Sequence, residues 1–148
     1  MIVDAQTRIE TASPADADGV LRLLDQNHLP LDGLGDHLST TLVARQDGQI
    51  VGSAALEMYP DGALLRSVAV APALQGHGLG HELTDAAIRL ARDLQVPAIY
   101  LLTTTADRYF PKFGFEPIQR ADVPPMVPTS VEFTSACPSS ATVMRKSL

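Results

Sequence analysis

The sequence has one cysteine, no membrane-length apolar run and no excess of basic residues, and each absence excludes a class of protein. Cys137 has no partner for an intrachain disulfide, which predicts a reducing, cytoplasmic compartment. No apolar stretch approaches the roughly 20 residues of a membrane span, so we expect no membrane partner. The formal net charge of −6 argues against nucleic-acid binding, which needs Lys and Arg to neutralise phosphates. The N-terminal stretch carries acids and no apolar core, so we expect no secretory signal.

The length of 148 residues predicts one domain, residues 1–148. Apolar and β-branched runs between turn residues predict strands at 8–11, 41–45, 49–57, 64–70, 98–103, 115–119 and 141–145. Apolar residues at helical spacing predict helices at 14–27, 79–94 and 106–113. The strand, helix, strand order around the long helix predicts a parallel pair near Val68 and Leu101, beside an antiparallel meander. The expected fold class is therefore α/β (α+β), a mixed, mostly antiparallel sheet with flanking helices.

Three glycines stand in five positions between a predicted strand and the long helix, in the run Gln75-Gly76-His77-Gly78-Leu79-Gly80. The first N–H groups of a helix attract anions, and glycines let phosphate oxygens approach the backbone. The following His81-Glu82 excludes a P-loop, and the spacing is not that of a dinucleotide fingerprint. A turn without a ligand is the alternative, but a simple turn needs only one glycine. The run therefore predicts a site for a phosphate-containing ligand.

The glycine run resembles the acyl-CoA pyrophosphate loop of the GNAT family of N-acetyltransferases. The resemblance rests on Gln75, Gly78 and Gly80, preceded by the strand end VAVAP at 68–72. The segment YFPKFGFEP at 109–117 resembles the family's Y-x-x-x-G-F segment, and the order of predicted elements also fits. Three shorter segments look like the ArsN-type acetyltransferases of bacterial arsenic-resistance operons, which are similar to amino-acid α-N-acetyltransferases; they are 64–70, 100–105 and 132–141.

The resemblance implies a GNAT fold with a splayed parallel strand pair, and acetyl-CoA as co-substrate with no metal. The main chain of Val68 and Val70 would bind the pantetheine. The pyrophosphate would lie against the loop residues Gln75, Gly76, His77, Gly78, Leu79 and Gly80, although the His77 side chain has the alternative of pointing to solvent. Thr103 or Thr104 would face the thioester end, and β-propensity alone is the other explanation for these threonines.

Acetyl transfer calls for a base at the acceptor amine and an acid at the CoA sulfur. In many relatives a tyrosine four residues before the G-F glycine is the acid, but here Phe110 holds that position. Tyr109 is the candidate acid, although one residue turns a helical side chain by roughly 100°; packing is its alternative role. Unassisted departure of the thiolate, or its protonation through water, is the other alternative. Glu57 is the candidate base, with a solvent-facing strand end as the alternative.

Arg66 interrupts an apolar strand, and its guanidinium suits a substrate carboxylate. Pairing with Glu57 inside the protein is the equal alternative. Arg45 is a weaker substrate-binding candidate of the same kind. Cys137 is either a small buried hydrophobe or, near Ser135 on the acceptor side, a reactive thiol.

The resemblance implies a small amine acceptor, an amino acid or an arsenic- or phosphorus-containing amino-acid-like toxin. A protein or peptide N-acetyltransferase and a non-catalytic acyl-CoA sensor are the alternatives. The oligomeric state stays open, with a homodimer paired through C-terminal strands as one possibility.

Overall fold

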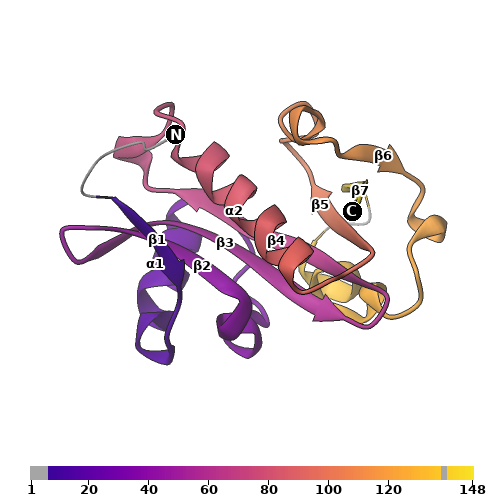
Figure 1. Cartoon of the computed structure of the whole chain (residues 1–148), viewed down its shortest axis with the longest axis horizontal. Helices are drawn as coiled ribbons and strands as arrows, with labels where there is room; N and C mark the ends of the chain where they lie inside the picture. Colours follow the sequence, from indigo (N-terminus) through magenta and orange to yellow (C-terminus); the bar gives the residue numbers. More distant parts are fainter. Residues whose placement is uncertain (1–6, 138–139) are drawn as a thin grey trace.

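The computed structural model describes residues 7–137 and 140–148, which form a seven-stranded mixed sheet with helices on both faces (Figure 1). The strand order is β1-β2-β3-β4-β5-β7-β6. The strands are β1 (Arg8–Thr11), β2 (Thr41–Gln46), β3 (Gln49–Tyr59), β4 (Gly62–Val70), β5 (Ala98–Thr103), β6 (Glu116–Ile118) and β7 (Thr142–Ser147). Neighbours are antiparallel except β4 and β5. The predicted fold class is confirmed.

Two α-helices cover opposite faces of the sheet. Helix α1 (Ala17–Gln26) packs with buried residues such as Val43 and Ala55, and α2 (Leu79–Asp93) covers the face that contains Leu42 and Leu56. The remaining helical turns are η1 (Pro14–Asp16), η2 (Leu34–Thr40), η3 (Pro72–Leu74), η4 (Phe110–Phe113), η5 (Arg120–Asp122), η6 (Val127–Thr129) and the π-turn η7 (Glu132–Ala136). No helix in the described ranges is long and apolar enough to cross a membrane.

Two helix predictions need correction. The expected long helix ends at Asp93, so Leu94 is outside it and 45% exposed. The expected helix over 106–113 is shortened to η4, because Pro111 has no N–H to donate to an earlier carbonyl. Gly114 ends this turn with φ 94°, in the left-handed region that favours glycine.

Strand β4 contains a bulge that separates it from β5. The register with β3 shifts between the pairs Ser53–Ala69 and Ala55–Arg66, and Ser67 there has φ 59°, which is uncommon for a residue with a side chain. The Ser53 hydroxyl donates to the Ser67 carbonyl at 2.7 Å and holds the bulge. Because a bulge bends its strand, β4 turns away from β5.

The parallel pairing of β4 with β5 is confined to the start of β4. Its register contains the pairs Ala63–Ile99 and Leu64–Tyr100. The predicted parallel direction is confirmed, but Val68 and Leu101 lie on the two walls of the open part. The resemblance implied this splay, and the bulge supplies its physical cause.

Candidate active site

A cleft of about 900 Å³ lies where β4 and β5 diverge. Residues 65–70 form one wall and 101–103 the other, and the glycine run closes one end. The lining includes eight of the predicted donor-site residues, namely Val68, Val70, Gln75, Gly76, Gly78, Leu79, Gly80 and Thr103. His77, the remaining predicted loop residue, is outside the described lining. The structure thus brings the sequence-predicted donor residues together in one cavity.

The turn before α2 itself requires more glycines than the single one predicted for a simple turn. Gly76 and Gly78 have φ 85° and 88°, so the turn itself uses two glycines and not one. Gly80 is helical, and a Cβ built there would lie 3.5 Å from the Tyr109 hydroxyl and 3.6 Å from Val70 Cγ2. The third glycine therefore keeps the wall beside the first helical turn free of a side chain.

The loop is fixed to its surroundings by Gln75. Its Nε2 donates to the Val70 carbonyl at 3.0 Å and to Asn27 Oδ1 at 3.1 Å, which ties the loop to the end of β4 and to the residue after α1. Helix α2 then begins with Gly78 as its N-cap, and the Glu82 N–H donates to the Gly78 carbonyl at 3.1 Å. The N–H groups of residues 79–81 precede this bond and lack acceptors within the helix. The helix start is thereby prepared for an anion.

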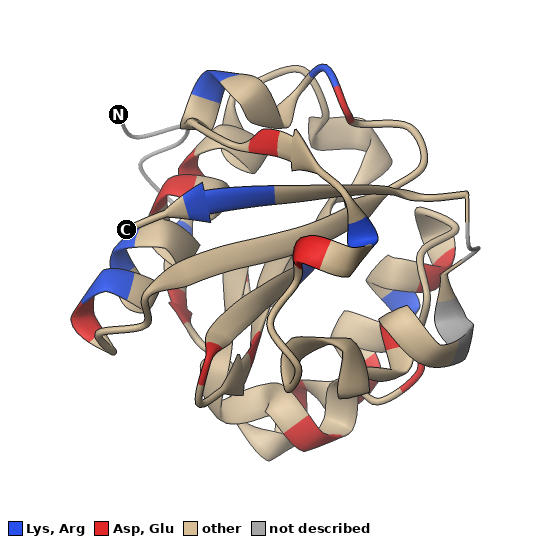
Figure 2. Cartoon of the chain, turned by 90° about the vertical axis from the view of Figure 1, so that its right-hand side faces the viewer, with Lys and Arg blue, Asp and Glu red and all other residues tan. Residues whose placement is uncertain are grey.

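The cleft is cationic although the protein is acidic. Among the described lining residues, the ionisable side chains are Arg66, His81, Arg108, Tyr109 and Lys112, and none is a carboxylate. Figure 2 shows the acidic residues spread over many elements of the chain. A cavity that excludes carboxylates while the chain carries a net charge of −6 suits an anionic ligand. Arg108 and Lys112 were not identified as site residues from the sequence, although Arg108 precedes the YFPKFGFEP segment at 109–117 and Lys112 lies within it.

Tyr109 lies at the helix side of the cleft. Its hydroxyl is hydrogen-bonded to the Thr84 side chain, and Thr84 Oγ1 donates to the Gly80 carbonyl at 2.9 Å. Burial raises the pKa of Tyr109, so it is a neutral phenol near pH 7. Lys112 Nζ lies 4.2 Å from its ring centroid. This places the hydroxyl beside the glycine loop. Phe110, at the usual tyrosine position, is buried in the core.

Thr103 stabilises the turn that follows β5. Its Oγ1 accepts N–H bonds from Ala106 at 2.8 Å and from Thr105 at 3.3 Å. The side chain therefore has a local structural role in addition to its place in the cleft wall.

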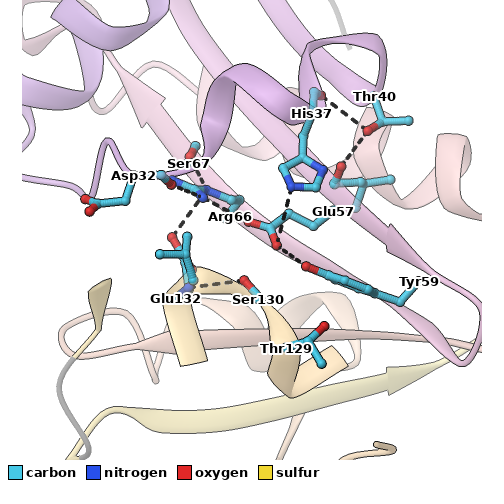
Figure 3. Close-up of polar contacts among 12 residues, drawn as sticks. Asp32, His37, Thr40, Glu57, Tyr59, Arg66, Ser67, Thr129, Ser130 and Glu132 are labelled. Atoms are coloured by element: carbon cyan, nitrogen blue, oxygen red, sulfur yellow. Dashed lines mark hydrogen bonds and ion pairs between the residues drawn. The ribbon is translucent and has the colours of Figure 1, made fainter. Parts of the chain in front are cut away.

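Beside the cleft, Glu57 on β3, Arg66 on β4 and Glu132 on η7 form a buried ionic cluster (Figure 3). Arg66 Nη1 lies 2.9 Å from Glu57 Oε2, and Arg66 Nε lies 3.3 Å from Glu132 Oε2. The Arg66 side chain is 0% exposed. The internal pairing with Glu57, one of the two alternatives for Arg66, is therefore present.

Arg66 also connects β4 to the loop between α1 and η2. Its Nη1 donates to the Asp32 carbonyl at 2.6 Å and its Nη2 to the Pro30 carbonyl at 3.1 Å, while Nε donates to Ser67 Oγ at 3.0 Å. Protein acceptors thus occupy the guanidinium fork that the sequence offered to a substrate carboxylate. Arg66 instead joins three segments that are distant in sequence.

The two carboxylates of the cluster differ in their environment. Burial raises the pKa of Glu57, but hydrogen bonds with Ser130, Tyr59 and Arg66 outweigh it, and the net pKa is lowered. The Tyr59 hydroxyl donates to Glu57 Oε1 at 2.6 Å. For Glu132, burial raises the pKa to about 7 despite the opposing Arg66. Glu57 is 1% exposed, so the solvent-facing alternative is wrong, and its lowered pKa makes it a weak base.

Three further residues are candidates from the sequence, namely Arg45, Cys137 and Ser135. Arg45 pairs with Glu10 Oε1 at 2.6 Å and with Asp16 Oδ2 at 2.8 Å, beside α1 and outside the described cleft lining. Burial raises the pKa of Cys137 to about 11, so its thiol is neutral near pH 7, which favours the unreactive interpretation. The Ser135 side chain lies outside the described part of the chain. No group of three or more potential metal ligands occurs among the described residues.

Comparisons with known proteins agree with this geometry. The family model described as "Acetyltransferase (GNAT) family" matches residues 6–115. An amino-acid acetyltransferase of Mycobacterium tuberculosis is 39% identical over 77 residues, which cover 51% of this chain and 44% of that protein. The amino-acid acetyltransferase of Mannheimia succiniciproducens is 28% identical over 125 residues, which cover 83% of this chain and 27% of that protein. The chain thus spans less than half the length of these relatives.

Solved structures extend the likeness over nearly the whole chain. The M. tuberculosis protein Rv2747, solved with CoA, has a TM-score of 0.80 and 27% identity, and 95% of this chain and 99% of that chain are covered. N-acetylglutamate synthase from Neisseria gonorrhoeae, solved with CoA and N-acetyl-glutamate, has a TM-score of 0.82 and 22% identity, with 98% and 36% covered. At 22% identity, the similarity to the synthase shows a shared fold.

Proposed function

The chain belongs to the GNAT family of acetyltransferases, and on this premise we propose that it moves the acetyl group of acetyl-CoA to the amino group of an amino acid. The observation that carries the proposal is the carboxylate-free cleft between the diverging β4 and β5, closed by the glycine run at the start of α2. Acetyl-CoA fits both the glycine run and the open edge of β4. Its phosphates are anionic and suit the start of α2, and its pantetheine amides can bond to the main chain of the strand edge.

The donor would lie along β4. The main chain of Val68 and Val70 borders the cleft beyond the last β4–β5 pair, and pairs with the pantetheine amides. The pyrophosphate lies against the N–H groups of residues 76–81. Arg108 and Lys112 add positive charge to the same cavity. Tyr109 contacts the donor near the glycine loop, a position that favours holding acetyl-CoA over protonating its sulfur.

In the reaction, the unprotonated amine attacks the thioester carbonyl carbon, the C–S bond breaks with its electron pair on sulfur, CoA leaves as a thiolate, and the new amide nitrogen loses its extra proton to solvent. A free thiol has a pKa near about 8.5, so a thiolate is an acceptable leaving group without a dedicated acid. The cationic lining of the cleft stabilises the charge that develops on sulfur. This explains how the chain functions with Phe110 at the position of the usual acid.

The acceptor is proposed from the relatives. The amino-acid acetyltransferases named above and the synthase solved with N-acetyl-glutamate point to an α-amino acid. The resemblance to ArsN-type enzymes narrows this to glutamate analogues that contain arsenic or phosphorus. A peptide N-acetyltransferase is the second candidate, and a non-catalytic acyl-CoA sensor the third.

Release of free CoA thiol from acetyl-CoA separates these candidates. We expect release to accelerate with an α-amino acid or with its arsinic or phosphinic analogue. Acceleration by a basic peptide alone would favour the peptide enzyme. If acetyl-CoA raised the melting temperature while no amine accelerated thiol release, the sensor would be the correct function.

A further inference from the structure

The buried cluster of Glu57, Arg66 and Glu132 carries one more negative charge than its cation balances when both carboxylates are ionised. Glu57 and Glu132 are 1% and 5% exposed at their side chains, and Arg66 is the guanidinium between them. His37 Nε2 lies 3.7 Å from Glu57 Oε1, so the partly exposed imidazole is adjacent to Glu57. A buried charge without a partner is unfavourable, so such a cluster takes up either a proton or an additional cation.

The two carboxylates are not equally satisfied. Glu57 is bound by Tyr59 and Arg66, and also by Ser130. Glu132 contacts Arg66 Nε at 3.3 Å and the Cys137 thiol. A carboxylate has about four acceptor sites. Glu132 therefore keeps more capacity than Glu57 for a further donor.

Glu132 is also close to the donor cleft. Nε is the guanidinium nitrogen nearest the main chain of β4, and it contacts both Glu132 Oε2 and Ser67 Oγ. Ser67 and Arg66 line the cleft, and Ser67 lies in the bulge of β4. The carboxylate thus lies one side chain away from the cavity that would hold the thioester.

We propose that Glu132 is the catalytic base, which binds the acceptor's ammonium group and takes one of its protons. This rests on the proposed function. The N–C bond forms at the thioester carbonyl, the C–S bond breaks with its electron pair on sulfur, and CoA leaves as thiolate. Two protons leave the nitrogen in all: the first passes from the ammonium group to the Glu132 carboxylate before the attack and later to solvent, and the second is released to solvent once the N–C bond has formed. The ammonium first supplies the cation that the cluster lacks, and the transferred proton then leaves the cluster neutral.

The titration of Glu132 supports this role. Its pKa of about 7 is set chiefly by burial, with Arg66 opposing and Glu57 reinforcing the rise. A general base works best when its pKa lies near the operating pH. The charged and titratable groups around it are Arg66 on β4, Glu57 on β3 with His37 beside it, and Cys137, whose pKa Arg120 also influences.

The test compares E132Q with E116Q, which removes the same charge from an exposed residue on β6. Each variant is assayed with an α-amino acid and with its aminooxy analogue, whose nitrogen is unprotonated at neutral pH and needs no base before it attacks the thioester. For E132Q we expect kcat/KM with the amino acid to fall by about 100-fold, since general bases contribute about 10²–10⁴. Activity on the aminooxy analogue should stay within a few-fold of wild type. In wild type, kcat/KM should rise as pH increases through about 7, and this limb should be lost in E132Q.

Equal losses on both acceptors, or full activity of E132Q on the amino acid, would overturn the role of Glu132. If E132Q does not fold, E132D takes its place, and a shifted pH limb is expected. If wild type acetylates only peptides, the proposed acceptor is wrong, and the same comparison on the peptide and its aminooxy form still decides the base. A wild type inactive on every amine refutes both proposals.

Discussion

Strand β4 separates two regions of opposite charge. The cleft proposed for the donor has the basic side chains His81, Arg108 and Lys112 in its wall and no carboxylate among its described residues, whereas the buried cluster proposed to receive the acceptor holds Glu57 and Glu132 around Arg66. The donor region comes mostly from one continuous stretch, β4 through the start of α2. The acceptor region is assembled from a loop, two strands and the C-terminal turn η7. Under the proposed function, the donor region would bind an anionic co-substrate and the acceptor region a cationic amine, and the two regions should respond differently to mutation.

The largest expected effect comes from removing the cation of the acceptor region. In Arg66→Met, two buried carboxylates lose their partner, and the free energy of unfolding should fall by about 3–5 kcal/mol. Arg45→Met is the matched control, because its ion pairs are more exposed and should contribute about 1 kcal/mol. Urea unfolding measures both. Equal losses would show that the buried cluster has no special importance for stability.

The acceptor region should also make stability depend on pH between the ordinary and the folded pKa of Glu132. The folded pKa is about 7 and the unfolded value 4.5, so in this window the folded state holds a proton that the unfolded state lacks. Stability should therefore fall as pH rises from 4.5 to 7, by up to about 1.4 kcal/mol per unit. The melting temperature of E132Q should change less with pH across this window than that of wild type. A wild-type stability that increased with pH across the window would contradict this.

The donor region is tested by Gly76→Ala against Gly48→Ala. Both glycines have positive φ, 85° and 78°, and open space around the position of a Cβ. Both substitutions should lower the free energy of unfolding by about 1–2 kcal/mol through the same backbone strain. Only G76A should weaken acetyl-CoA binding, by about 10-fold, which corresponds to about 1.4 kcal/mol. Calorimetric titration with acetyl-CoA distinguishes the two variants. Equal affinities of G76A and G48A would show that the glycine loop does not bind the donor.

The smallest effect should come from Tyr109→Phe. Loss of one hydroxyl near Gly80 should raise KM for acetyl-CoA about 3-fold, as expected for a single hydrogen bond, with kcat unchanged. Steady-state kinetics with varied acetyl-CoA checks this. A drop in kcat that shrinks at high pH, where the wild-type phenol is itself deprotonated, would instead identify Tyr109 as the acid at the sulfur.

The sequence predicted the donor region well because its determinants are local. Gly76 and Gly78 act within a few residues of their place in the chain, as does the bond of Gln75 to Val70, so spacing alone indicates the turn and the helix start; the bond of Gln75 to Asn27 is the long-range exception. The strand order of the meander is similarly local, since hairpin turns fix it.

The acceptor region was harder to predict because its contacts are long-range. The pair of Arg66 and Glu132 has no period or spacing that indicates it, and η7 lies in a segment that lacks regular structure signals. Glu57 looked like a strand-end residue until β3 proved to extend to Tyr59, whose hydroxyl binds it. An arginine in an apolar strand indicated a buried partner, but not which one, and not that there were two.

The bulge at Ser67 has a consequence for the order in which substrates bind. The gap between β4 and β5 originates in the sheet itself, since the Ser53 hydroxyl of β3 holds the bulge by its bond to the Ser67 carbonyl. A preformed cavity loses little conformational freedom when it is filled. Acetyl-CoA can therefore enter first, and its thioester then completes one wall of the space that receives the amine. Bisubstrate kinetics would register this as a sequential mechanism in which the nucleotide arrives ahead of the acceptor.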